Sequence, residues 1–344
     1  MTALTMPARP ERDDEALRPL PWRRMAGVTW RQHRAALAGV AVFLGAWAVY
    51  LWLAGLQLHH AYAAATACHP ASSLACGEII SEFNVTYGDP ALTAAVLLQT
   101  VPALIGAFVG APVLARELET GTFRYAWTLG ISRRRWTLGK LVPLAIAVAA
   151  VAGAFSLLLS WYYTPFFAEG QQTTLAPTVF DLRGVALPAW TLAAFAIGAL
   201  AGMLIRRVVP AIAATLAAWA GLALTAALYL RQHYAVPLRT SNLNVPGSAW
   251  IMSQWWTKGG KFAFANWHDA PASLVQRCSA AGPLGKGSPG TLYQCFAQHG
   301  YTQWTSYQPG SRFWPFQWIE GGWLLALSVL LIAATVWLVR RRAA

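Results

Sequence analysis

Long blocks of this chain are apolar, and they lack the regular polar positions that give a soluble helix or strand its water-facing side. A helix needs about 20 mostly apolar residues to cross a bilayer. Six stretches reach that length: 35–57, 91–114, 141–163, 184–205, 211–230 and 321–339. The pattern predicts an all-α polytopic membrane protein with six transmembrane helices.

Composition and charge agree with this prediction and orient the chain. Hydrophobic residues make up 56% of it and charged residues 11%. Basic flanks are retained on the cytoplasmic side, and placing both termini there puts 18 of the 26 Lys and Arg residues inside. We therefore expect cytoplasmic N and C termini in the plasma (inner) membrane. The formal charge of +13 follows from this topology and suits membrane lipids as partners, not nucleic acid.

The spans divide the chain into four parts. Residues 1–34 form a cytoplasmic segment, 35–230 hold helices one to five with a hairpin at 115–140, 231–320 form an extracellular domain, and 321–344 hold the sixth helix and a basic tail. Within 22–34, the four arginines share one arc of a helix, which predicts an amphipathic helix lying at the interface. A charged stop before the first span is the alternative.

All four cysteines fall in segments that this topology places outside, where disulfides persist. Local pairing would join Cys68 to Cys76 and Cys278 to Cys295. Four cysteines permit three connectivities, so the spacing favours this pairing without excluding the others or four free thiols.

Two small-xxx-small patterns occur within the spans, at 106–110 and 198–202. Such patterns let helix backbones approach closely. The sequence predicts tight helix packing at these points, either within one chain or between two.

Several kinds of chemistry are missing from the sequence. Every Asp, Glu and His lies outside the six stretches or at a boundary, which disfavours ion-coupled carriers and in-membrane catalysis. No metal site is predicted. The segment 282–288 resembles a phosphate-binding loop, but Ala280 stands where the first Gly should be. We therefore expect no ATPase activity in this chain and no cofactor bound by it.

One cytoplasmic connection has a distinctive order of residues. Positions 114–128 read L-A-R-E-L-E-T-G-T-F-R-Y-A-W-T, and 132–136 read S-R-R-R-W, followed by Lys140. The first residues continue the second helix, Gly121 permits a turn, and Thr122 can cap a short second helix. The segment predicts a helical hairpin with acidic and basic groups available to a partner, although a solvated loop would hold the same charges.

This segment resembles the signature of ABC-2 type transporter permeases of the actinobacterial kind. A second stretch, 307–320, is similar to the pattern that leads into the last helix of that family. The six-span layout and the long last outer connection match the rest. The resemblance implies the membrane subunit of an exporter for a hydrophobic or amphipathic antibiotic, drug, lipid or peptide.

The resemblance also implies partners and site residues. Two permease chains, more readily a homodimer than a heterodimer, would join nucleotide-binding subunits that hold ATP and Mg²⁺. The hairpin would dock on those subunits through Arg116, Glu117, Glu119, Gly121, Thr122, Arg124, Arg133, Arg134 and Arg135. Gln99 and Thr100 are the candidates for the substrate path in the second span.

Two other functions remain open at this stage. A membrane-embedded lipid-modifying enzyme would need acidic and His residues near the outer surface, and its candidates are Glu78, Glu82, Asp89, His268 and Asp269. A non-transporting sensor or immunity subunit would instead bind its ligand through the Trp-rich outer domain.

Overall fold

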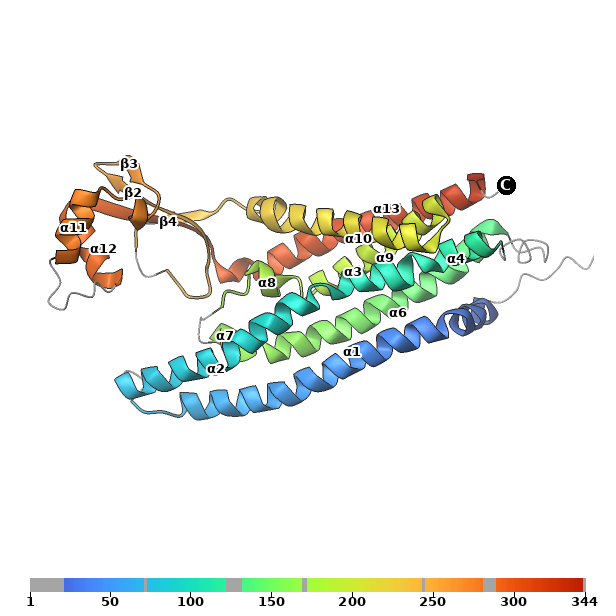
Figure 1. Ribbon diagram of the computed structural model, residues 1–344, viewed down its shortest axis with the longest axis horizontal. Helices are drawn as coiled ribbons and strands as arrows, with labels where there is room; N and C mark the ends of the chain where they lie inside the picture. Colours follow the sequence, from blue (N-terminus) through green and yellow to red (C-terminus); the bar gives the residue numbers. More distant parts are fainter. Residues whose placement is uncertain are drawn as a thin grey trace, which may run out of the picture.

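The computed structural model describes residues 22–70, 73–121, 132–168, 172–242, 245–280 and 289–342. Its long helices lie side by side in an elongated bundle (Figure 1). At one end, the terminal end, the described chain begins at Trp22 and α13 finishes at Arg342. The other end, the head end, carries a small region between the fifth and sixth spans.

Six segments are long and apolar enough to cross a membrane, which confirms the number of spans predicted. They are Ala38–Thr66, Leu74–Thr120, Arg133–Tyr162, Ala186–Ile205, Val208–His233 and Gly310–Arg341. Most extend past the predicted limits, because apolarity marks the part that crosses lipid whereas helical hydrogen bonding continues to the cap. The helix α1 (Trp22–Thr66) is continuous from 22–34 into the first span; the side chains of that stretch, apart from Gly27, lie outside the described residues.

The first two spans form a long hairpin toward the head end. Helix α1 buries Leu44, Leu51, Leu58 and Ala65, one residue in every seven, and leaves its other faces largely exposed. Helix α2 (Leu74–Leu98) is capped by Ser73, whose hydroxyl accepts a hydrogen bond from the Cys76 amide at 3.2 Å. A disulfide between Cys68 and Cys76 closes the hairpin.

The second span is one path made of four helical pieces. After α2 come α3 (Val101–Ile105), a π-helical turn η1 (Gly106–Gly110) and α4 (Pro112–Thr120). Pro102 and Pro112 each lack the backbone N–H that a regular helix needs. In the π-helical turn between them, the Ala111 amide donates to the Gly106 carbonyl at 2.9 Å, five residues back. The continuous helix predicted for 91–114 is therefore interrupted twice.

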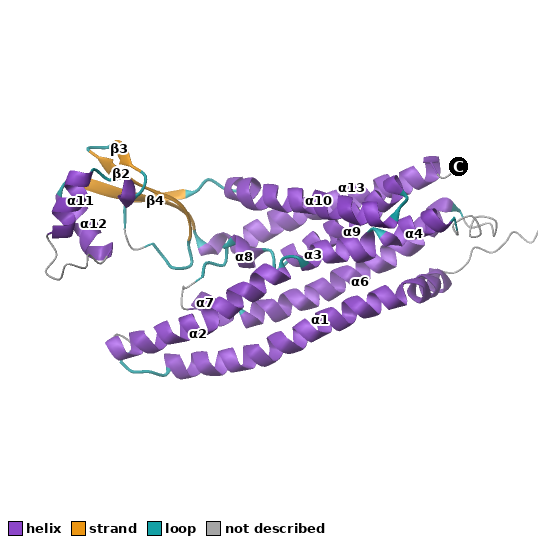
Figure 2. Cartoon of the chain, in the orientation of Figure 1, coloured by secondary structure: helices purple, strands orange, loops and turns teal. Residues whose placement is uncertain are grey.

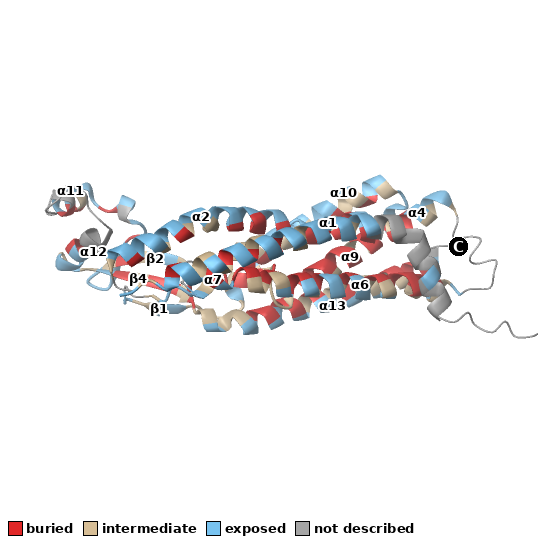
Figure 3. Cartoon of the chain, turned by 90° about the horizontal axis from the view of Figure 1, so that it is seen from below, coloured by how far each residue is buried: buried red, intermediate tan, exposed pale blue. Residues whose placement is uncertain are grey.

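The remaining spans include one buried helix, α9 (Ala186–Ile205), which other spans surround. The remaining spans are α6 (Arg133–Tyr162), α9, α10 (Val208–Thr225) with η2 (Ala226–Leu230) and η3 (Arg231–His233), and α13 (Phe313–Arg342). Short helices α7 (Thr164–Ala168) and α8 (Pro177–Phe180) connect α6 to α9. Figure 3 shows buried residues along much of α9, which packs against the second span, α6, α10 and α13.

Glycines allow α9 to touch the backbone of the second span. A Cβ added to Gly198 would lie 2.3 Å from the Gly106 carbonyl oxygen, and one added to Gly202 would lie 2.4 Å from the Ala111 carbonyl oxygen. From the other side, a Cβ on Gly110 would lie 2.6 Å from the Phe195 carbonyl oxygen. The two small-xxx-small patterns therefore pack against each other within one chain.

The head region, residues 234–312, is not helical throughout, so the prediction of an all-α protein is wrong there. It contains β1 (Leu238–Thr240), β2 (Trp250–Lys258), β3 (Lys261–Phe264) and β4 (Tyr301–Gln308) in the antiparallel order β1-β4-β2-β3. Figure 2 shows these strands together at the head end. Gly259 and Gly260, both with positive φ, make the two-residue β2–β3 turn. Gly-Gly between aromatic and β-branched residues is a hairpin signal that the sequence carried.

A small core stabilises the head region. It consists of Trp256, Phe264, Leu274, Phe296 and a disulfide between Cys278 and Cys295, which joins α11 (Ala272–Ala280) to α12 (Pro289–Gln298). The local cysteine pairing predicted from the spacing is thus present in both places. The described head region ends at η5 (Gly310–Arg312), because α13 begins at Phe313, seven residues before the predicted domain limit at 320.

The Gly198 contact can be tested by adding one methyl group. Gly198→Ala is expected to lower the melting temperature in detergent, because backbone atoms cannot rotate away from the new Cβ and overpacking costs about 1–3 kcal/mol. The matched control is Gly221→Ala on α10, where an added Cβ meets nothing within 4 Å. Since Ala favours a helix over Gly by about 1 kcal/mol, the control should melt at or above the wild type. Equal melting temperatures for the two variants would contradict the close contact.

Candidate functional site

The segment between the second and third spans lies at the terminal end of the bundle. Helix α4 continues the second span to Thr120 and ends at Gly121, whose φ of 72° places it in the left-handed region. A residue with a Cβ is strained there. The chain is described again from Ser132, whose hydroxyl caps α6 by accepting from the Arg135 amide at 3.4 Å.

Glu117 faces α6. Its carboxylate forms a short ion pair with the Lys140 ammonium, and both side chains are largely buried. The ammonium also lies 4.6 Å from the centre of the Trp136 ring. Each charge therefore has a partner at a depth where an unpaired charge would be costly.

Glu119 faces α10 instead. Its carboxylate accepts a hydrogen bond from the Val208 amide at 3.0 Å, and Val208 is the first residue of that helix. A negative charge at a helix N-terminus satisfies a free N–H and interacts favourably with the helix dipole. The second span is thus bonded to the start of the fifth.

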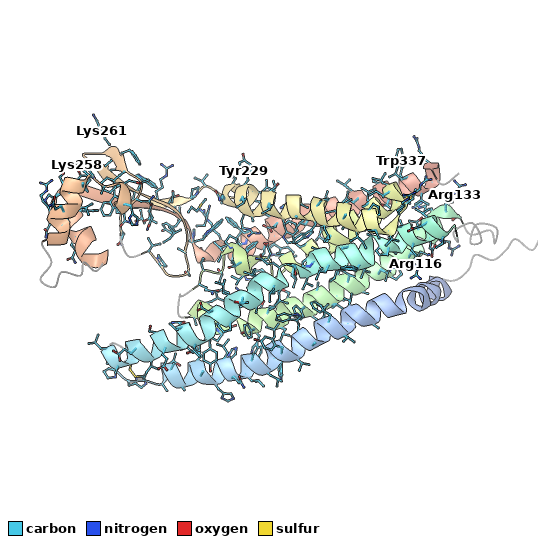
Figure 4. The ribbon with its side chains drawn as sticks, viewed as in Figure 1. Arg116, Arg133, Tyr229, Lys258, Lys261 and Trp337 are labelled. Carbon is cyan, nitrogen blue, oxygen red and sulfur yellow. A yellow bond between two sulfur atoms is a disulfide. The ribbon has the colours of Figure 1, made fainter. Side chains whose placement is uncertain are left out.

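The basic cluster reaches the end of the chain. The guanidinium of Arg133 donates to the Arg340 carbonyl of α13 at 3.3 Å, while Arg134 is exposed and Arg135 is partly buried. Figure 4 places Arg116 and Arg133 together at the terminal end, and Arg116 is exposed on α4.

These contacts change the picture of a charged hairpin projecting toward a partner. Both carboxylates predicted to dock on another subunit are engaged by neighbouring spans of the same chain. Arg116, Glu119 and Arg134 are exposed and Gly121 is half-buried; Thr122 and Arg124 lie outside the described residues. We name α4 with Gly121 and residues 132–140 the coupling segment, after the role that the resemblance implies for it.

Gln99 and Thr100 lie at the break between α2 and α3. The Gln99 amide donates to the Pro177 carbonyl of α8 at 2.8 Å, and the Thr100 hydroxyl donates to the Leu97 carbonyl at 2.7 Å. Thr100 is exposed and Gln99 is half-buried. Both donor groups are therefore occupied within the chain, and the Gln99 contact attaches the kinked second span to the α8 turn.

A buried ionic network closes the head end of the bundle. The Arg231 guanidinium binds the Glu320 carboxylate through two hydrogen bonds, of 2.7 and 3.1 Å, and neither side chain is exposed. It also contacts the Asp181 carboxylate and lies 4.3 Å from the centre of the Phe180 ring. Trp190 donates to Glu320 at 2.8 Å. The network joins the end of the fifth span, the start of the sixth and α9.

Four further hydrogen bonds reinforce this junction. Tyr234 donates to the second Glu320 oxygen at 3.1 Å and accepts from the Trp323 indole at 2.9 Å. One turn before Glu320, the Gln317 side chain accepts from the Ala186 amide at 2.8 Å and donates to the Phe180 carbonyl at 3.0 Å. Both chain segments that lead into the head region are therefore attached to the bundle by polar contacts.

Asp181 lies in the loop before α9, where one guanidinium serves two carboxylates. Burial raises the pKa of Asp181 to about 8; Arg231 opposes the shift and the nearby Glu320 adds to it. We name Asp181, Arg231, Glu320 and Trp190 the head-end network.

The observed spans extend past the predicted limits, so three ionisable groups that the sequence placed at span boundaries lie within them. Arg231, Glu320 and Lys140 each lie within a span, near its end, and each has a partner of opposite charge. The sequence held one usable signal. Asp181, Arg231 and Glu320 adjoin the predicted fourth, fifth and sixth spans, each at the end that the predicted topology places outside. Opposite charges at one membrane depth are candidates for pairing.

Among the described residues, one group of three potential metal ligands lies close together: Cys278, Cys295 and His299. Its two sulfurs form a disulfide and so offer no thiolate to a metal. The acidic and His candidates for a lipid-modifying enzyme form no such group in the described parts of the chain.

Comparison with known protein families matches residues 40–231 to the family described as "ABC-2 membrane transporter related". The match covers 192 of the 344 residues. The chain belongs to this family. Searches of curated proteins and of solved structures found no match.

The family assignment bears on the site just described. The matched part of this ABC-2 protein runs from the first span to Arg231, so it contains the coupling segment, Gln99, Thr100 and one member of the Arg231–Glu320 pair. It makes the chain a multi-pass permease component of an ABC transporter, a class that works with a nucleotide-binding ATPase subunit. The head region and the sixth span lie outside the match.

The head-end network of the ABC-2 protein can be tested by removing its charges in turn. Arg231→Leu leaves buried carboxylates without a counter-charge, a change that costs about 3–5 kcal/mol and should strongly lower the melting temperature. Glu320→Gln alone should also destabilise. Added to Arg231→Leu, however, Glu320→Gln should raise the melting temperature, because it removes an unpaired buried charge.

The control for these variants is Arg239→Ala, since Arg239 is exposed in the head region. Exposed substitutions of this kind change stability by about 0.5 kcal/mol or less. Simple addition of the Arg231→Leu and Glu320→Gln effects in the double variant would contradict the pairing.

Asp181 should give stability a pH dependence. Its pKa is higher in the folded protein, about 8, than the ordinary 3.8. Folding therefore takes up a proton between these two pH values, and stability falls as pH rises from about 4 to about 8. Asp181→Asn should remove this part of the decline, measured as melting temperature against pH. Asp269→Asn, exposed in the head region, is the control and should keep the wild-type slope. Identical slopes for Asp181→Asn and the wild type would refute the assignment.

Proposed function

We propose that this ABC-2 protein is the permease subunit of an ATP-driven exporter in the plasma membrane. The terminal end faces the cytoplasm and the head region faces outward. ATP and Mg²⁺ are held by separate nucleotide-binding subunits. The proposal rests on family membership and on the contacts of the coupling segment.

The observation that carries the proposal is the set of spans that the coupling segment contacts. It is continuous with the second span through α4 and with the third through α6. It is bonded to the fifth through Glu119 and Val208, and to the sixth through Arg133 and the Arg340 carbonyl. A displacement imposed on this segment by an ATPase subunit would therefore reach four of the six spans directly.

Docking uses the surface that these contacts leave open. Arg116 and Arg134 are exposed basic groups on either side of Gly121, and they suit an acidic face on the ATPase subunit. Glu117 and Glu119 transmit movement to the third and fifth spans, and the exposed Glu119 is also open to contact with the partner, as the resemblance implies.

Two permease chains, as a homodimer, form the working unit. The fifth span exposes a largely apolar side that includes Val209, Leu216, Leu224 and Leu228, which suits contact with a second chain or with lipid. The path between the two chains carries a hydrophobic or amphipathic compound, such as an antibiotic, a drug, a lipid or a peptide. Gln99 and Thr100 line it at the kink of the second span, where they offer few polar groups.

Coupling can be tested by co-expressing the chain with a nucleotide-binding subunit and measuring copurification, ATP hydrolysis and export from vesicles. Glu119→Ala removes the bond to α10, and Gly121→Pro is incompatible with a positive φ. Both variants should still insert, but export per ATP hydrolysed should fall by about 5- to 150-fold, the range of typical coupling free energies.

Glu82→Ala is the matched control, because Glu82 is exposed on α2 at the opposite end of the same span. It should export at the wild-type rate. Wild-type export per ATP in both coupling variants would refute the role of the coupling segment, and failure of the wild type to bind any nucleotide-binding subunit would refute the exporter itself.

A further inference from the structure

An apolar cavity of about 530 Å³ lies between the first, second and third spans. Its wall consists of α1 residues 40–48, Ile105 and Val109 of the second span, and α6 residues 143–158. At 1.5 Å per residue, the α6 part of the wall is about 22 Å long, against a hydrocarbon thickness of about 30 Å. The cavity is thus elongated and lies at the depth of the lipid tails.

The described residues that line the cavity are Gly, Ala, Val, Leu, Ile, Pro and Phe. None of their side chains donates or accepts a hydrogen bond. A water molecule needs several polar partners to occupy a buried site, and a polar ligand would lose its own hydrogen bonds there. The wall therefore selects a hydrocarbon group.

Small residues create the space. A Cβ added to Gly45 would meet no atom within 4 Å, whereas a Cβ added to Gly55, further along the same helix, would lie 2.4 Å from the Trp161 ring. Trp52 stacks on that ring with centroids 5.0 Å apart. Helices α1 and α6 are therefore in contact near Trp161 and separated at Gly45.

The cavity opens to its surroundings along this seam. Gly45 of α1 and Val151 and Ala154 of α6 line it and are exposed. Since the seam lies within two membrane spans, the matter that adjoins it is lipid hydrocarbon. An empty cavity would forfeit the dispersion contacts of its whole wall, and its volume is in the range of pockets that hold small ligands, about 300–1,000 Å³.

The geometry points to a binding site for one hydrocarbon chain of a bilayer lipid, held between α1 and α6 and contacting the second span. The chain fills the seam and keeps α1 apart from α6 beside the π-helical turn. This inference does not rest on the proposed export function, because a lipid can occupy the site whether or not the protein transports anything.

The test uses full-length protein in phosphatidylcholine vesicles that contain a phosphatidylcholine with a photoactivatable diazirine near the end of one acyl chain. After illumination, peptide mass spectrometry measures labelling of residues 40–48 and 143–158. We expect these peptides to be labelled above the exposed apolar side of α13, which includes Val329 and Leu330 and serves as the internal reference. Labelling no higher than on α13 would overturn the inference.

A filled cavity provides the second arm. Gly45→Leu with Ala147→Leu places side chains into the space and should reduce labelling of both segments to the α13 level, with no loss of melting temperature. The matched control, Gly39→Leu with Ala150→Leu, uses exposed positions of the same helices that do not line the cavity, and it should label like the wild type. Unchanged labelling in the filled variant would overturn the inference.

Two further measurements identify a different occupant. If a soluble amphiphile that the protein exports displaced the label, the cavity would be a substrate site and the lipid inference would be overturned. If labelling were lost when two chains associate and returned on dilution to monomers, a second copy of the chain would cover the cavity. That result would also overturn the lipid inference. Both readouts are independent of ATP hydrolysis, so loss of transport and loss of lipid binding are distinguishable.

Discussion

The bundle depends on the backbone contact between α9 and the second span. Lipid tails are as apolar as leucine, so helices in a bilayer are held by close packing and polar contacts, not by removal of apolar surface from water. The glycines of the two small-xxx-small patterns let carbonyl and amide groups of the two helices approach to distances that exclude any Cβ. The interrupted second span is thereby fixed against α9, the most buried of the six described spans.

Polar contacts then define the two ends of this packed centre. At the head end, Arg231 and Glu320 bring together the chain that enters the head region and the chain that leaves it. At the terminal end, Glu117 and Glu119 attach the second span to the third and fifth. At both ends of the bundle, a charged side chain near the end of a span binds a group on a neighbouring span. These contacts join several spans at each end.

The first span, like the fifth, is less buried than the other spans. Helix α1 buries one narrow stripe and meets α6 tightly near Trp161, yet the two helices separate at Gly45. Contacts with α6 and the hairpin disulfide hold it to the bundle, and the hydrocarbon-filled seam leaves part of its length free of direct protein contact.

The sequence by itself determined the six spans, because a run of apolar residues long enough to cross lipid needs no tertiary information to be recognised. It also indicated the local disulfides and the two glycine patterns, and its charge pattern contained the unused clue to the head-end network. Only the tertiary structure decided that Glu117 and Glu119 face neighbouring spans, that the glycine patterns meet within one chain, and that α1 and α6 leave a cavity. These features depend on how each helix is rotated and placed against the others, which local hydropathy does not encode.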